Sequence, residues 1–151
     1  MKEALENARE ELKRVDHLIY VSLKYTRTVD VIKSIIDRLI NSLEFSIDSL
    51  TKLALEKGMI ASVPSNLGLK CNAIRKKFSD QQIDEMVQFF VYLRKLNKAD
   101  YRRSNEFRRH VTMTAIVDGQ VLNITMDVIK EYYEKTRAYI DHAAELVGTG
   151  A

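Results

Sequence analysis

The sequence predicts an all-α protein, an up-and-down bundle of four to five helices with a short β-hairpin inserted before the last helix. Three observations lead to this prediction. The 151 residues include one proline and five glycines, so few positions favour a break in a helix. Long stretches place apolar residues three and four positions apart, which is the spacing of a buried helical face. The stretch VTMTAIVDGQVLNIT, in contrast, is rich in the β-branched residues that favour strands.

The first helix is expected from about Lys2 to Tyr25, where apolar residues recur in alternating steps of three and four. Thr28 is a suitable N-cap for the second helix, which should end at Gly58. At roughly 30 residues and about 1.5 Å per residue, this helix would be around 45 Å long. We therefore expect it to form the spine of the domain.

Pro64 and Gly68 mark the connection to a short amphipathic helix over residues 69–78. Ser79 and Gln82 have the spacing of a capping box, so the next helix is expected to begin at Ser79. Its apolar face continues to Leu96, and we expect it to carry the chain into the basic segment that follows.

Asp118-Gly119 lies between two β-branched runs and favours a type I′ hairpin turn, because both central residues of that turn need positive φ. An isolated hairpin is marginal in water, so it should pack on the bundle or on another copy of the chain. A last helix is expected from about Met126 to Val147.

The length suits a single domain, residues 1–151. No uncharged apolar run approaches the roughly 20 residues of a membrane span, and the first residues lack the apolar centre of a signal peptide. We therefore expect a cytoplasmic protein with no membrane contact. Cys71 is the single cysteine, which excludes an internal disulfide and a multi-cysteine zinc site.

Positive charge is concentrated in one segment of the chain. Residues 94–110 contain seven lysines or arginines against two acids, whereas the remaining sequence holds 17 basic and 19 acidic residues. A confined basic field suits a polyanionic partner, but a solvated helix face would have the same composition. Arg102, Arg108, Arg109 and Lys98 are the residues that we expect to contact a nucleic-acid backbone.

Arg103 and His110 are the candidate catalytic pair. A helix that continued through this segment would turn about 700° over seven residues and place both side chains on one face. A guanidinium can hold a phosphate, and an imidazole can transfer a proton near neutral pH. Cleavage of RNA by attack of the ribose 2′-hydroxyl needs these two functions and no metal. The alternative is a surface network in which Glu106 pairs with both residues.

The long helices followed by RSNEFRRH and a final helix resemble the HEPN superfamily (higher eukaryotes and prokaryotes nucleotide-binding), whose signature is R-x4-6-H. The resemblance implies a metal-independent endoribonuclease that requires no cofactor, in which Arg103 stabilises the scissile phosphate and His110 transfers protons. It also implies a homodimer acting on single-stranded RNA, as a toxin or defence component beside an antitoxin or nucleotidyltransferase.

Two other classes of function fit the same residues. One is a non-catalytic helical interaction or assembly module that uses the basic segment for binding. The other is an accessory subunit of a nucleoprotein complex. Aromatic residues on the last helices are compatible with either a dimer interface or a single core. These are Phe89, Phe90, Tyr92, Tyr132, Tyr133 and Tyr139.

Overall fold

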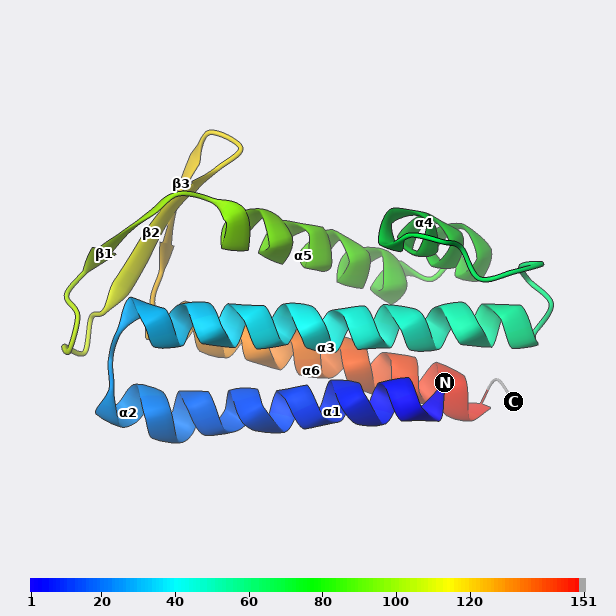
Figure 1. Ribbon diagram of the computed structural model, residues 1–151, viewed down its shortest axis with the longest axis horizontal. Coiled ribbons are helices and arrows are strands. Elements are labelled where there is room, and N and C mark those ends of the chain that lie inside the picture. Colours follow the sequence, from blue (N-terminus) through cyan, green and yellow to red (C-terminus); the bar gives the residue numbers. More distant parts are fainter. Residues whose placement is uncertain (150–151) are drawn as a thin grey trace.

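The structure, a computed structural model, describes residues 1–149. It is a helical bundle with a small sheet at one end (Figure 1). The long helices are α1 (Lys2–His17), α3 (Val29–Glu56), α5 (Gln81–Lys98) and α6 (Met126–Thr149), and the shorter α4 (Leu67–Phe78) lies over the end of α3 that is far from the sheet. Within the described residues, no helix combines the length and the apolar character that a bilayer span needs. The predicted helical bundle is confirmed in outline.

The helix α3 is the centre of the bundle and packs against α1, α4, α5 and α6. Its apolar residues point to more than one side, and those without exposed surface include Ile32, Ile36, Leu39, Leu43, Ile47 and Leu50. Two buried serines let α1 approach closely, because their hydroxyls are satisfied by its backbone. Ser42 Oγ donates to the Ala8 carbonyl at 2.8 Å, and Ser49 Oγ donates to the Met1 carbonyl at 2.9 Å.

The expected first helix, residues 2–25, is not a uniform α-helix. After α1 the chain forms a π-helical segment η1 (Leu18–Ser22) and one further turn, α2 (Leu23–Tyr25). The wider turn changes the helical phase, so Ile19 and Leu23 stay buried while Tyr20 is 51% exposed. The apolar spacing of the sequence predicted the helical path but not this local change in its winding.

The helix ends agree with the sequence at α3 and differ at α4 and α5. Thr28 caps α3, accepting a hydrogen bond from Val31 N, as predicted. The prediction of Ser79 as the N-cap of α5 is wrong. Ser79 ends α4 with a φ of 48°, and Asp80 caps α5 by accepting from Ile83 N at 3.0 Å. A carboxylate is at least as good an N-cap as a hydroxyl. Because the N-cap of α5 is one residue later than predicted, Ser79 can end α4.

The prediction of a two-stranded hairpin was incomplete, because the sheet has three antiparallel strands in the order β1-β2-β3. These are β1 (Tyr101–Ser104), β2 (Thr112–Val117) and β3 (Gln120–Ile124). The β2–β3 turn is the predicted one, with φ of 50° at Asp118 and 79° at Gly119. The sheet packs on the bundle through a buried face that includes Val111, Met113, Ala115 and Ile124.

The helix α5 carries the chain into the basic segment, as expected, but β1 replaces a helix that would continue through that segment to His110. Ala99 leaves the helix with an extended backbone, at φ −70° and ψ 150°. Tyr101 then pairs with Ala115, and Arg103 pairs with Met113. Pairing with β2 satisfies the backbone of YRRS, and this tertiary contact overrides the weak local preference of these residues for a helix.

Candidate nucleic-acid interface

The turn between β1 and β2, residues 105–111, holds the last part of the basic segment. Asn105 and Phe107 have positive φ, at 54° and 64°. The turn is closed by hydrogen bonds from Arg108 N to the Asn105 carbonyl and from Val111 N to the Arg108 carbonyl, both at 3.1 Å. Positive φ in a bulky residue such as Phe107 is uncommon and is kept only where surrounding contacts fix the backbone.

Those contacts come from the loop before α3 and from the first residue of α3. Phe107 N donates to the Arg27 carbonyl at 2.6 Å. Glu106 Oε2 accepts from Val29 N at 3.2 Å, so its carboxylate lies at the positive end of the α3 dipole. Two segments that are about eighty residues apart in the chain are therefore joined at one end of the bundle.

Arg103 is held by acidic residues. Its guanidinium donates to Asp30 Oδ1 at 2.8 Å and to the Tyr101 hydroxyl at 3.1 Å, and it lies 3.8 Å from Glu106 Oε2. The hydrogen bond that Arg103 donates to Asp30 raises the pKa of the Arg103 guanidinium above its usual value. These contacts connect β1 to the start of α3, so Arg103 stabilises the turn between β1 and β2 in this structure.

The expectation that Arg103 and His110 share a helical face is wrong. Arg103 lies in β1 and His110 at the end of the following turn, because the helix ends at Lys98. His110 is exposed, and its carbonyl accepts from Thr112 Oγ1 at 2.8 Å. Both residues stay at the same end of the molecule, but the periodicity that was expected to align them does not exist.

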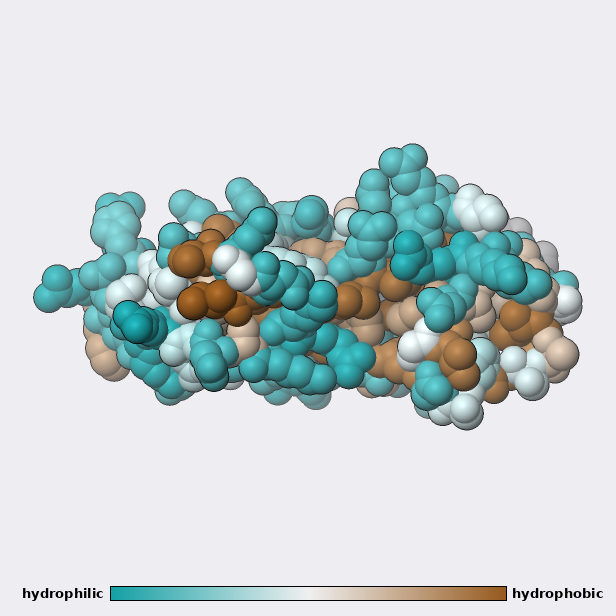
Figure 2. Space-filling view, turned by 90° about the horizontal axis from the view of Figure 1, so that it is seen from above, coloured by the Kyte–Doolittle hydropathy of each residue, from teal (hydrophilic) through white to brown (hydrophobic). Residues whose placement is uncertain are grey.

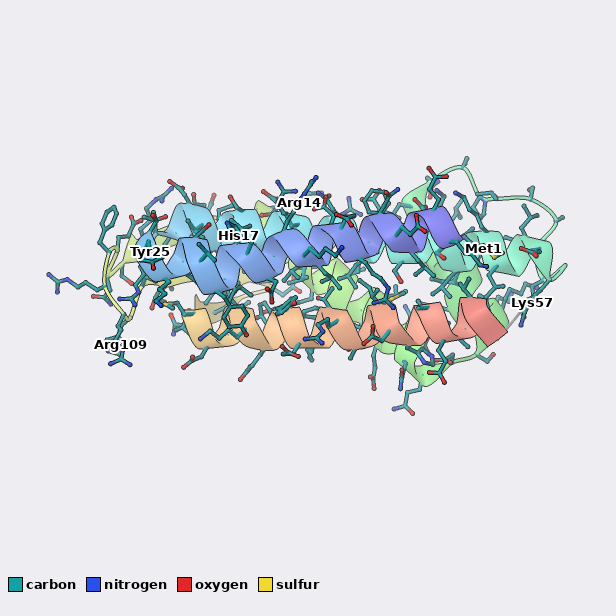
Figure 3. All side chains as sticks on the ribbon, turned by 90° about the horizontal axis from the view of Figure 1, so that it is seen from below. Met1, Arg14, His17, Tyr25, Lys57 and Arg109 are labelled. Atoms are coloured by element: carbon teal, nitrogen blue, oxygen red, sulfur yellow. The ribbon has the colours of Figure 1, made fainter. Side chains whose placement is uncertain are left out.

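The other basic residues of the segment fall into two groups. Arg94 lies over the Phe90 ring, with its guanidinium carbon 5.6 Å from the centroid, and Lys95 pairs with Asp118 at 3.1 Å. The second group is exposed, and its side chains have no hydrogen bond or ion pair within residues 1–149. It comprises the four residues predicted to contact nucleic acid, Lys98, Arg102, Arg108 and Arg109. In Figure 3 Arg109 extends away from the end of the bundle.

Three further residues at this end were not identified from the sequence. Tyr25 is 77% exposed and Phe107 is 74% exposed, so two large rings face solvent on the two joined segments. Tyr25 lies at the same end as Arg109 in Figure 3. Arg27 is the third, and its Nε is buried without a hydrogen-bond partner among the described residues. In the sequence, Tyr25 and Arg27 could have been found from KYTR, residues 24–27, where an aromatic residue lies between basic ones directly before the N-cap Thr28.

Lys24 also belongs to this end, with its Nζ 5.9 Å from the centre of the Tyr25 ring. We call the following residues the tip surface: Lys24, Tyr25, Arg27, Arg102, Phe107, Arg108, Arg109 and His110. Two acids at this end of the fold, Asp30 and Glu106, are both within ion-pair distance of Arg103. The tip surface therefore combines unpaired cationic groups with exposed rings, a combination that can hold phosphates and stack on bases. Within residues 1–149, His, Cys, Asp and Glu side chains form no group of three that could hold a metal ion.

Comparison of the chain with protein-family models, curated proteins and solved structures gave no match.

Proposed function

We propose that this protein binds single-stranded RNA through the tip surface. The observation that supports this most strongly is the exposed Phe107 ring, fixed on a constrained turn and followed directly by two unpaired arginines. A ring held in this way loses little conformational freedom when a base stacks on it. The guanidinium groups beside it are suited to bidentate contact with phosphate oxygens.

The exposed rings favour a single strand over a duplex. Bases in a duplex are already stacked, whereas the bases of a single strand are free to stack on aromatic side chains. Tyr25 and Phe107 belong to two different segments that are joined by the hydrogen bond from Phe107 N to the Arg27 carbonyl. The tip surface thus offers two stacking positions with basic side chains around them.

Removal of charge at two matched places tests this proposal. Arg108→Gln/Arg109→Gln removes two positive charges from the tip surface, and Lys76→Gln/Lys77→Gln removes two from exposed positions at the end of α4. Binding of a fluorescent oligouridylate would be measured by anisotropy over a range of salt concentrations. The logarithm of the binding constant falls linearly with the logarithm of the salt concentration, and each phosphate contact contributes about 0.7 to the steepness of this slope. The slope of the tip variant should therefore be shallower than that of wild type by about 1.4. Equal effects of the two double variants would contradict the proposal.

Phe107 is tested separately because its contribution is not electrostatic. Phe107→Ala should weaken binding by about 5- to 150-fold, corresponding to the roughly 1–3 kcal/mol of one base stacked on an aromatic ring. The salt slope should stay unchanged, because no phosphate contact is removed. A Phe107→Ala protein with the affinity of the wild type would exclude stacking at this position.

Cleavage of the bound RNA is a second candidate function, and the exposed ring of His110 in the same turn favours it. In that function Arg103 would exchange Asp30 for the scissile phosphate, and His110 would transfer protons, as the resemblance to HEPN nucleases implies. His110→Ala should then abolish cleavage in the presence of a chelator while most of the binding remains. Equal cleavage by wild type and His110→Ala would reject this role, and binding without any cleavage would leave a binding module.

A further inference from the structure

The outer face of the sheet contains a hollow of about 520 Å³ beside the tip surface. It is lined by Asp100, Tyr101, Arg102, Thr114, Ile116 and Val121. The volume lies within the roughly 300–1,000 Å³ of small-molecule sites. Arg102 belongs both to this hollow and to the tip surface, so the two are continuous along β1.

The floor of the hollow is apolar and open to solvent. Ile116 and Val121 are directly paired across β2 and β3, and they are 63% and 62% exposed. Figure 2 shows apolar atoms over this end of the molecule, with hydrophilic side chains around them. A flat aliphatic pair inside a polar rim is suited to contact with the face of a planar ring.

The edge of the hollow carries one acid and one base, neither of which is paired. The side chains of Asp100 and Arg102 are exposed and make no hydrogen bond or ion pair within residues 1–149. Asp100 follows Lys98 closely, in a segment whose field is positive. A carboxylate at this position weakens the attraction of a phosphate backbone, so contact with phosphate does not account for it.

We propose that this hollow binds a guanine base of the RNA strand held by the tip surface, an inference that rests on the proposed function. Guanine presents two neighbouring donors, N1–H and the N2 amine, to the Asp100 carboxylate. It presents the acceptors O6 and N7 to the Arg102 guanidinium, the pairing most often used to read this base. Uracil lacks the paired donors, and adenine lacks O6, so neither satisfies both residues.

Three oligouridylates that differ at one central base test the proposal. The central base is guanine, adenine, or hypoxanthine, the base of inosine, which lacks the N2 amine of guanine. Wild-type protein should bind the guanine oligonucleotide at least about 5-fold more tightly than either of the others. Asp100→Asn should remove this preference, while its affinity for plain oligouridylate should not fall, because a negative charge is lost. Glu56→Gln, which removes an exposed acid at the far end of α3, is the control and should keep the preference.

A second measurement examines the hollow without the tip surface. Guanosine monophosphate should shift the methyl resonances of Ile116 and Val121, and uridine monophosphate should leave them in place. Salt-dependent binding of all oligonucleotides with equal affinity would overturn the guanine site and retain the proposed function. If no oligonucleotide binds, the proposed function fails. Methyl shifts specific to guanosine monophosphate would then still support the hollow as a guanine site, and their absence would overturn it.

Discussion

Substitution of Glu106 by alanine should lower both the stability of the fold and the affinity for RNA. Glu106 Oε2 accepts from the backbone of Val29 at 3.2 Å, where α3 begins. A hydrogen bond of this capping type contributes about 1 kcal/mol. The carboxylate at the helix N-terminus adds about 0.3–1 kcal/mol. The Arg103 contact at 3.8 Å adds only tenths of a kcal/mol, because Arg103 is 40% exposed.

The expected loss for Glu106→Ala is therefore about 1–2 kcal/mol in the free energy of unfolding. For a chain of this size it corresponds to a fall in Tm of about 2–8 °C. Urea unfolding followed by circular dichroism would measure it. Glu6→Ala is the matched control, because Glu6 is exposed on α1 and makes no hydrogen bond or ion pair within residues 1–149. Glu6→Ala should stay within about 0.5 kcal/mol of wild type.

The RNA affinity of Glu106→Ala gives a second test with a distinctive sign. Loss of a negative charge beside the tip surface would by itself raise the affinity for RNA. We expect the affinity to fall instead, because the turn that carries Phe107 would be less firmly attached to α3. A Glu106→Ala protein as stable as wild type, or one that binds RNA more tightly, would refute the role of Glu106 as the anchor of this turn.

Three further predictions concern the rest of the bundle. Burial raises the pKa of Asp80, but hydrogen bonds from Ile83 N and His142 outweigh it and hold that pKa below its usual value. Wild type should therefore be more stable than Asp80→Asn above about pH 4, and this difference should disappear as the pH falls through the pKa of Asp80 in the folded protein. Urea unfolding at several pH values would measure it. Burial and the hydrogen bond to Asp16 raise the pKa of Tyr133 to about 12. In an alkaline ultraviolet titration, Tyr133 should ionise at a lower pH in the Asp16→Asn variant than in wild type. Identical titration curves would show that Asp16 does not contribute to the raised pKa of Tyr133. Phe90 is 1% exposed, so Phe90→Ala should cost about 3–5 kcal/mol, and a calorimetric Tm near that of wild type would contradict its place in the core.

Those parts of the fold that depend on local signals were predictable. The apolar spacing of α3, the N-cap Thr28 and the positive φ of Asp118 and Gly119 each depend on residues close together in the sequence. The strand β1 depends instead on pairing with residues about ten positions away, and YRRS carries little strand preference of its own. The local sequence therefore favoured a continued α5, whereas pairing with β2 places these residues in a strand.

The candidate site was predictable in composition but not in geometry. The sequence places the basic residues Lys98, Arg102, Arg108 and Arg109 in one segment, and all four are exposed in the structure. It did not indicate that Arg103 would be engaged by Asp30, because that contact joins residues 73 positions apart. The sequence also did not indicate that Phe107 would be exposed. Its exposure depends on the positive φ of the turn and on the hydrogen bond from Phe107 N to the Arg27 carbonyl.

Cross-linking tests the central claim, that RNA contacts the tip surface, most directly. Wild-type protein would be irradiated with an oligoribonucleotide that contains 4-thiouridine, digested, and analysed by mass spectrometry. We expect cross-linked peptides from the two joined segments, around Tyr25 and around Phe107, and loss of these peptides in Arg108→Gln/Arg109→Gln. Cross-links confined to α4 or to the middle of the bundle, with the tip surface unmodified, would contradict the proposal.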